Sequence, residues 1–337
     1  MKSLGVLVTA LAAIAAGPAA GAEKLRIGYL PVTGHAKFFV AQEQGFFAKE
    51  GLEVELVEFV NSADGINALV AGKVDLGAFG TTAPLVHISR GTDLKIIGGV
   101  MGEDAAIITT PANAGSIKGV ADLRGKKVAT VRLASGDAVL RGALHDAGLD
   151  WRKDLQIFEL KNPPAVIEAV KSGQVDAGVV WGPHDYRAEE QGLRIVSRSN
   201  TLQPGHPCCR LTVRASALRE RARWVRLVRA ILRAEKFTRE DHQHTVDAIV
   251  KYLKLDRGLV EKAFYSGFVE QNTDPNLKGI RRFWKTMQES QFIDTKESID
   301  SHVELGVYKE ALDGLAKESP KEPVWAELQK KFPGRNL

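Results

Sequence analysis

The chain holds two cysteines, and they stand side by side in the segment PGHPCCR at residues 204–210. Cys208 and Cys209 can pack as small apolar thiols, form a disulfide, or bind a soft metal together with His206. Adjacent Cα atoms lie about 3.8 Å apart, below the usual disulfide range of about 4.4–6.8 Å, so a bridge would be strained. In extended backbone the two side chains point to opposite sides, which gives one metal at most two ligands here. The sequence leaves the three alternatives open.

Five other segments could hold a small ligand. Each combines glycine, hydroxyl or ring side chains after an expected strand and before an expected helix: Thr33-Gly34-His35, Asn61-Ser62, Gly80-Thr81-Thr82, Ser135-Gly136-Asp137, and Trp181 with His184. Helix starts present unpaired N–H groups and the positive end of the helix dipole, which suit a small anion. The competing interpretation is structural: the hydroxyl and Asp137 side chains as helix caps, Trp181 as core, and both histidines as surface residues.

Strands and helices are expected to alternate along the chain. Apolar residues alternate with polar ones at 25–29, 52–59 and 74–78, as in half-buried strands. Helices are expected at 36–44, closed by a glycine, and at 65–71, after a loop rich in cap residues. This order predicts an α/β protein.

A weak internal repeat predicts two related lobes. GKVDLGAFG begins at Gly72, GQVDAGVVW begins at Gly173, and the shared Asp75 and Asp176 are expected to serve the turn that enters each strand. KLRIGYLPVTGH at Lys24 is echoed by KKVATVRLASGD in the same order. Chance similarity between buried strands is the alternative.

Turn-forming segments suggest where the lobes meet. We expect crossings between lobes near residues 111–116 and 197–207, with lobe 1 formed by 23–110 plus 205–337 and lobe 2 by 111–204. After residue 213 the composition turns helical, and an apolar stripe around Trp224 predicts an amphipathic helix.

The first 22 residues resemble a secretory signal peptide. Lys2 precedes an apolar run, and Ala20-Gly21-Ala22 offers small residues for cleavage. The chain is therefore expected outside the inner membrane, in the periplasm. Its 46 basic and 41 acidic residues give a formal net charge of +5, and no basic stripe with interleaved aromatics indicates nucleic-acid binding.

Several runs together resemble the solute-binding proteins of ABC importers, in the branch that binds nitrate, sulfonates, taurine and thiamine-pyrimidine precursors. They are AQEQGFFAKEGLEVELVEF, ALVAGKVDLGAFGTTAPL, IKGVADLRGKKVAT and AVKSGQVDAGVVWGPH. The resemblance implies a two-lobed α/β periplasmic-binding-protein fold of the Venus-flytrap, type II-like kind, here with a helical C-terminal region. It also implies a monomer that needs no cofactor or metal and delivers its solute to a permease with ATPase subunits.

The same resemblance places residues 204–210 in the cleft between the lobes, with Arg210 or His206 near an anionic group. A small sulfonate- or nitrate-like anion is the expected solute, and a thiamine-pyrimidine precursor or another heteroaromatic solute is the alternative. Arg132 and Arg210 facing inward would favour an anion, whereas Asp64 and Asp137 would favour an amine or zwitterion. A pyrimidine-forming enzyme is the second functional class, but the chain shows no nucleophile–base motif.

Overall fold

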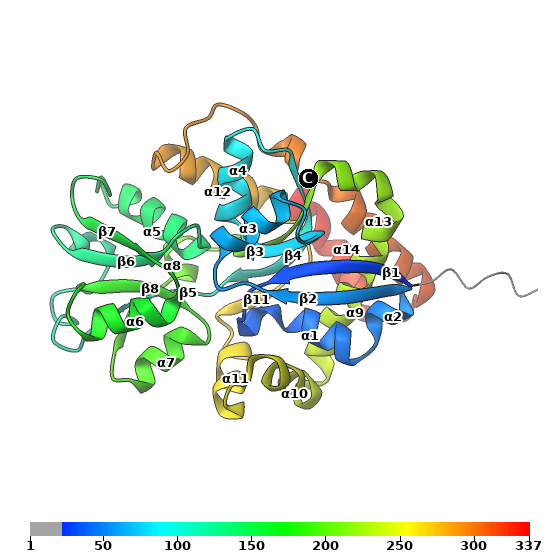
Figure 1. Cartoon of the computed structure of the whole chain (residues 1–337), viewed down its shortest axis with the longest axis horizontal. Coiled ribbons are helices and arrows are strands. Elements are labelled where there is room, and N and C mark those ends of the chain that lie inside the picture. Colours follow the sequence, from blue (N-terminus) through cyan, green and yellow to red (C-terminus); the bar gives the residue numbers. More distant parts are fainter. Residues whose placement is uncertain (1–21) are drawn as a thin grey trace, which may run out of the picture.

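The computed structural model describes residues 22–337, so the expected signal peptide lies outside the described residues except for Ala22. The chain builds two β-sheets, each packed against helices, and they lie side by side along the longest axis of the molecule (Figure 1). We call the part around the larger sheet lobe 1 (residues 22–103 and 209–337) and the part around the smaller sheet lobe 2 (residues 105–202). The two-lobed α/β prediction is confirmed.

Lobe 1 contains a mixed sheet with the strand order β11-β4-β10-β3-β1-β2. β1 pairs in parallel with β2 and β3, whereas β10 is antiparallel to β3 and β4. The strands are β1 (Glu23–Tyr29), β2 (Leu52–Glu58), β3 (Leu76–Gly80), β4 (Leu94–Glu103), β10 (Cys209–Arg214) and β11 (Val269–Gln271).

Lobe 2 repeats this arrangement in the order β7-β6-β8-β5-β9. β6 is parallel to β7 and β8, and β5 is antiparallel to β8 and β9. The strands are β5 (Ala105–Thr109), β6 (Lys127–Val131), β7 (Gln156–Leu160), β8 (Ala177–Trp181) and β9 (Arg194–Arg198). In each lobe the antiparallel strand in the sheet interior is the one that arrives from the other lobe.

Helices cover both sheets. The N-terminal part of lobe 1 has η1 (Thr33–His35), α1 (Ala36–Glu43), α2 (Phe46–Lys49), α3 (Ser62–Val70) and α4 (Thr82–Ser89). Lobe 2 has η2 (Val120–Leu123), α5 (Ser135–Asp146), α6 (Pro163–Lys171), α7 (His184–Glu190) and α8 (Ser199–Leu202). The C-terminal part has η3 (Ala215–Glu220), α9 (Arg221–Glu240), α10 (His242–Leu253), α11 (Arg257–Phe264), α12 (Leu277–Glu289), η4 (Asp300–His302), α13 (Leu305–Glu318) and α14 (Pro323–Asn336).

The internal repeat corresponds to equivalent local structure. In lobe 1 the Asp75 carboxylate accepts a hydrogen bond from the Arg26 N–H at 2.9 Å, and in lobe 2 the Asp176 carboxylate accepts one from the Lys127 N–H at 2.8 Å. Each aspartate thereby ties the entry of one strand to a neighbouring parallel strand, β1 in lobe 1 and β6 in lobe 2. Both therefore have the turn role expected from sequence.

The chain passes from lobe 1 to lobe 2 at Asp104, between β4 and β5. The segment 111–116 follows β5 and lies within lobe 2, so the first passage comes earlier than expected. Glu103 and Asp104 both have positive φ, 65° and 80°, so the chain bends there. The prediction had placed the bend at residues 111–116, which contain proline and glycine. The second passage is the segment between the end of α8 at Leu202 and the start of β10 at Cys209. It overlaps the expected segment 197–207 and extends one residue past it.

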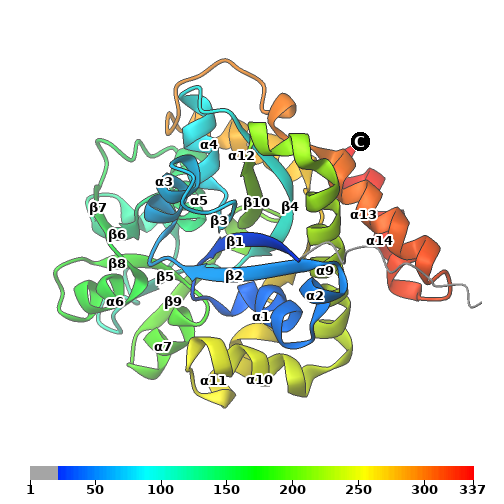
Figure 2. The ribbon, with the colours of Figure 1, turned by 45° about the vertical axis from the view of Figure 1, so that its right-hand side comes forward.

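The largest apolar core lies in lobe 1, because the C-terminal helices pack on its sheet. α9 contributes Trp224 and the rest of the stripe predicted from sequence, and it packs against α1 and α13. Figure 2 shows α9, α13 and α14 gathered on the side of lobe 1 away from lobe 2. Within residues 22–337, no helix has the length and apolar character needed to cross a membrane.

Candidate functional site

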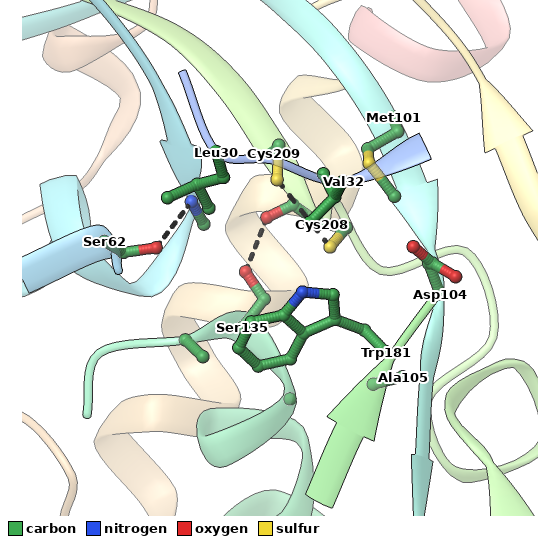
Figure 3. A pocket seen from close by; sticks show the side chains of 13 residues that line it. Leu30, Val32, Ser62, Met101, Asp104, Ala105, Ser135, Trp181, Cys208 and Cys209 are labelled. Atoms are coloured by element: carbon green, nitrogen blue, oxygen red, sulfur yellow. Dashed lines mark hydrogen bonds between the residues drawn. The ribbon is translucent and has the colours of Figure 1, made fainter. Parts of the chain in front are cut away.

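A small pocket with about 20 Å³ of accessible volume, partly open to solvent, lies where the two lobes meet. Both lobes and both passages between them contribute to its wall (Figure 3). The lining residues are Leu30, Val32, Ser62, Gly80, Met101, Asp104, Ala105, Ala134, Ser135, Gly136, Trp181, Cys208 and Cys209.

The fold explains this position. Leu30 and Val32 follow β1, Gly80 ends β3 and Trp181 ends β8, while Ser135 begins α5 just after β6. The carboxyl ends of the parallel strands of both sheets thus face the same space, which is where open α/β sheets bind ligands. The position of the pocket therefore follows from the strand topology and does not depend on any one side chain.

Hydrogen bonds join the two lobes beside the pocket. The Cys208 carbonyl accepts from the Thr81 N–H of lobe 1 and from the Ser135 hydroxyl of lobe 2. Asn61 caps α3 by accepting from the Asp64 N–H at 2.8 Å, and its amide also donates to the Lys161 carbonyl of lobe 2 at 3.3 Å. The lobes are consequently held close together around the cavity.

Most of the pocket wall is apolar or sulfur-bearing. Trp181 extends its indole across the cavity close to the two thiols (Figure 3). Cys208 and Cys209 are free thiols with Sγ atoms 3.9 Å apart, and Met101 adds a thioether. Both cysteines are unbridged in this structure and pack in the pocket wall.

Asp104 is the one ionisable carboxyl group that lines the pocket within the described residues. It is 6% exposed, accepts from the Gly182 N–H at 3.1 Å through Oδ1, and leaves Oδ2 without a hydrogen-bond partner. Burial raises the pKa of Asp104 well above its ordinary value, and the nearby Asp185 charge raises it further. An unpaired acceptor therefore lies beside the cavity.

Comparison with known proteins identifies the family. Residues 18–253 match the sequence profile of the NMT1-like family, which is more than half of the chain. The chain belongs to the NMT1-like family. It is 29% identical over 248 residues to a protein of Brucella abortus named as a binding protein, covering 72% of this chain and 76% of that one.

Two proteins of Escherichia coli are also similar to this NMT1-like chain. The taurine-binding periplasmic protein is 29% identical over 210 residues, 61% of this chain and 62% of the relative. The crystal structure of the periplasmic aliphatic sulphonate binding protein superposes with a TM-score of 0.70 at 25% identity, covering 84% of this chain and 92% of that one. The expectation of a binding protein instead of an enzyme agrees with these relatives.

Seven of the residues singled out from sequence line the pocket of this NMT1-like chain. They are Ser62, Gly80, Ser135, Gly136, Trp181, Cys208 and Cys209. Ser62 points its hydroxyl at the backbone, accepting from the Gly80 N–H at 3.1 Å. A Cβ on Gly80 would lie 3.1 Å from the Ser135 nitrogen, so glycine permits the close approach of the lobes there.

The segment Thr33-Gly34-His35 lies behind the pocket wall instead of in it. His35 is fully buried, and its Nδ1 accepts from the Leu30 N–H at 3.1 Å. Burial, together with the Lys37 charge, lowers the pKa of His35 to about 3, so this ring is neutral. The histidine shapes the loop, and its neighbours Leu30 and Val32 contact the cavity.

The two threonines and Asp137 also lie outside the pocket lining. Thr81 and Thr82 are fully buried, outside the pocket lining, and neither hydroxyl has a hydrogen-bond partner. Thr81 precedes α4 but forms no side-chain cap bond. Asp137 turns away from the cavity to pair with Arg141 at 3.0 Å, because its position in the first turn of α5 places that arginine one turn later.

His184, His206 and Arg210 do not line this pocket either, so the predicted contact of Arg210 or His206 with an anion has no counterpart in its wall. His184 begins α7 and has a pKa lowered to about 4 by burial and the Arg187 charge. Arg210 is fully buried and donates to the carbonyls of Cys209 and Met101. Because side chains alternate along β10, Cys209 faces the cavity and Arg210 the opposite side of the sheet.

Sequence reasoning missed six lining residues: Leu30, Val32, Met101, Asp104, Ala105 and Ala134. Five of them are apolar, and their types carry no chemical signal. Asp104 did have one, because Glu103 and Asp104 interrupt the otherwise apolar run from residue 96 to 108, and acids are rarely buried. Within residues 22–337, no three His, Cys, Asp or Glu side chains are grouped to hold a metal.

Proposed function

We propose that this NMT1-like chain is the solute-binding component of an ABC import system. One observation carries the proposal: a pocket at the strand ends, with walls from both lobes and from both passages between them. A ligand there touches both lobes at once, so binding energy favours the closed arrangement. The names of the similar proteins support the same role.

The passages at Asp104 and between α8 and β10 are the elements about which the lobes would move. Each is a single chain segment, and the backbone at Glu103 and Asp104 already adopts positive φ. We expect the open form to break the Ser135–Cys208 and Asn61–Lys161 hydrogen bonds and to reform them over bound solute. Solute binding would thus close the lobes, and a membrane permease can recognise the closed form.

Location and partners follow from the same proposal. The chain would be exported by its N-terminal segment, act in the periplasm as a monomer, and hand its solute to a permease driven by ATPase subunits. This role requires no nucleophile, cofactor or catalytic metal. A pyrimidine-forming enzyme is not supported by the pocket, whose ionisable side chains are one carboxyl group and two adjacent thiols.

A pocket-filling variant tests the proposal. Ala134 is 5% exposed and lines the cavity, so Ala134→Phe should occupy the solute space. Ala326→Phe makes the same change on an exposed face of α14 and is the control. At millimolar concentration, at least one of taurine, methanesulfonate, nitrate and benzylamine should raise the melting temperature of the wild type and Ala326→Phe, but not that of Ala134→Phe. If no solute stabilises the wild type, or if Ala134→Phe responds equally, the proposed function is wrong.

A further inference from the structure

Among the acids near the pocket, Asp104 differs from Glu103 and Asp185 because it has no basic partner in the described part of the chain. Glu103 pairs with His206 at 3.1 Å, and Asp185 pairs with Arg198. Asp104 lies between these pairs in the chain's first passage, and no lysine, arginine or histidine within residues 22–337 lies within ion-pair distance of it. Its one protein donor is the Gly182 N–H.

The rest of the wall is unsuited to a small oxyanion. Within the described residues, no lysine, arginine or histidine lines the pocket, and Arg210 lies behind the sheet. A small anion is normally bound by charge-assisted donors, and Asp104 would repel it when ionised. The helix α5 does begin at the pocket wall with Ser135 and Gly136, and helix starts favour anions, so a sulfonate is the relevant competitor.

The apolar wall calls for a ligand with an apolar body. Trp181 offers a flat face, and Met101, Cys208 and Cys209 offer polarisable sulfur atoms around the same space. Indole and sulfur both pack well on ring systems, and the indole face also attracts a cation. A solute that placed only polar atoms here would lose its water without replacement.

We propose that the pocket selects a small organic cation, in which an ammonium or related N–H group bonds to the free oxygen of Asp104 and an apolar body packs against Trp181 and the sulfur-bearing wall. This inference rests on the proposed function and names the solute class for it. It differs from the small anion that the sequence led us to expect. The cation gives the unpaired carboxylate the partner that the protein does not supply.

Three ligands with one ring and different head groups test the selection. Calorimetric titration with benzylamine, benzyl alcohol and benzenesulfonate compares a cation, a neutral donor and an anion on the same apolar body. Benzylamine should bind at least tenfold more tightly than either of the others. Benzenesulfonate binding as tightly as benzylamine would overturn the proposal.

The matched variant is Asp104→Asn. It removes the charge, keeps the shape, and suits the φ of 80°, because asparagine tolerates positive φ well. Benzylamine should bind roughly 10- to 100-fold more weakly to Asp104→Asn, the effect of losing a hydrogen bond to a charged group. Benzyl alcohol should change less than threefold. Equal loss for both ligands, or none for benzylamine, would refute the role of Asp104.

The outcomes separate the solute class from the function. If benzenesulfonate binds, and Ala134→Phe abolishes that binding, the pocket is a solute site but the organic-cation inference fails. If benzylamine binds to wild type and Ala134→Phe alike, the binding is elsewhere and the inference fails as well. If none of the three ligands binds, the inference is wrong, and the taurine, methanesulfonate and nitrate arms decide the proposed function independently.

Discussion

Two buried carboxyl groups in this protein have opposite surroundings. Glu235, in the core of lobe 1, is 1% exposed and lies 3.6 Å from Lys37, with the Thr273 N–H donating to it at 2.8 Å. Asp104, between the lobes, is 6% exposed and has one backbone donor. Burial favours the neutral form of both acids, yet the Lys37 and Arg239 charges hold the pKa of Glu235 below its ordinary value, whereas that of Asp104 is raised.

The difference indicates which acid serves the fold and which serves a ligand. A buried charge that the protein itself satisfies fixes a packing arrangement: Lys37 lies on α1, Glu235 on α9 and Thr273 in the loop before α12. A buried acid that the protein leaves unsatisfied costs stability and is retained where something else binds it. The predictions below test this distinction.

The largest expected effect comes from breaking the satisfied pair. Glu235→Gln leaves the ammonium of Lys37, which is fully buried, without its counter-charge. We expect the free energy of unfolding, measured by urea denaturation at pH 7, to fall by about 3–5 kcal/mol. Ligand binding by the folded fraction should stay unchanged, because neither side chain lines the pocket.

A compensating double variant separates charge from packing. Lys37→Met with Glu235→Gln removes the stranded charge and should recover most of the lost stability. Because burial lowers the pKa of Lys37 to about 8 even with its partner, the cation depends on Glu235. If Glu235→Gln alone lowers the free energy of unfolding by less than about 1 kcal/mol, Glu235 contributes no more to the fold than a surface acid does.

Much of the fold was readable from sequence because it depends on repeated local patterns. The alternating apolar residues marked β1 to β3, and the Gly72 and Gly173 repeats marked equivalent strands in the two lobes. The first passage between lobes was misplaced because positive-φ residues at Glu103 and Asp104 have no composition signal as strong as glycine or proline. That bend is set by tertiary packing.

The candidate site was only half readable, for a reason of side-chain direction. Ser135, Trp181 and Cys209 line the cavity as chemistry suggested, but Arg210 turns to the other face of the same strand. A one-residue offset decides between the two faces, and charge alone pointed to the wrong one. Apolar lining residues such as Val32 have no distinctive type and become visible only in three dimensions.

A second buried ion pair, between His206 and Glu103, gives a pH-dependent prediction. Burial opposes a charge on His206, but its contacts with the Cys208 thiol and the Glu103 carboxylate raise its pKa to about 9. A raised pKa contributes stability that is complete below about pH 6.5 and is lost as pH rises toward 9. The shift corresponds to at most about 3 kcal/mol.

Chemical denaturation at intervals from pH 6 to 8.5 measures this effect. The stability difference between wild type and His206→Gln should shrink steadily over that range. His244→Gln, at an exposed and paired histidine on α10, is the control and should follow the wild-type curve. A wild-type advantage over His206→Gln that stays constant with pH would mean that His206 acts by packing against Phe283 and not by its charge.

The smallest expected effect has the opposite sign and concerns the unsatisfied acid. The folded chain raises the pKa of Asp104, so this acid ionises more readily in the unfolded chain. Its ionisation therefore favours unfolding at any pH above the ordinary aspartate value of 3.8. In the absence of ligand, Asp104→Asn should therefore be more stable than wild type at pH 7, by about 1–2 kcal/mol, the typical cost of an unsatisfied buried group. The gain should shrink as pH falls toward 4, and benzylamine should reduce or remove it by stabilising the wild type more than the variant, which binds it more weakly. Thermal unfolding across pH with and without benzylamine measures both parts. An Asp104→Asn variant less stable than wild type at pH 7 would place Asp104 with Glu235, as a group that serves the fold.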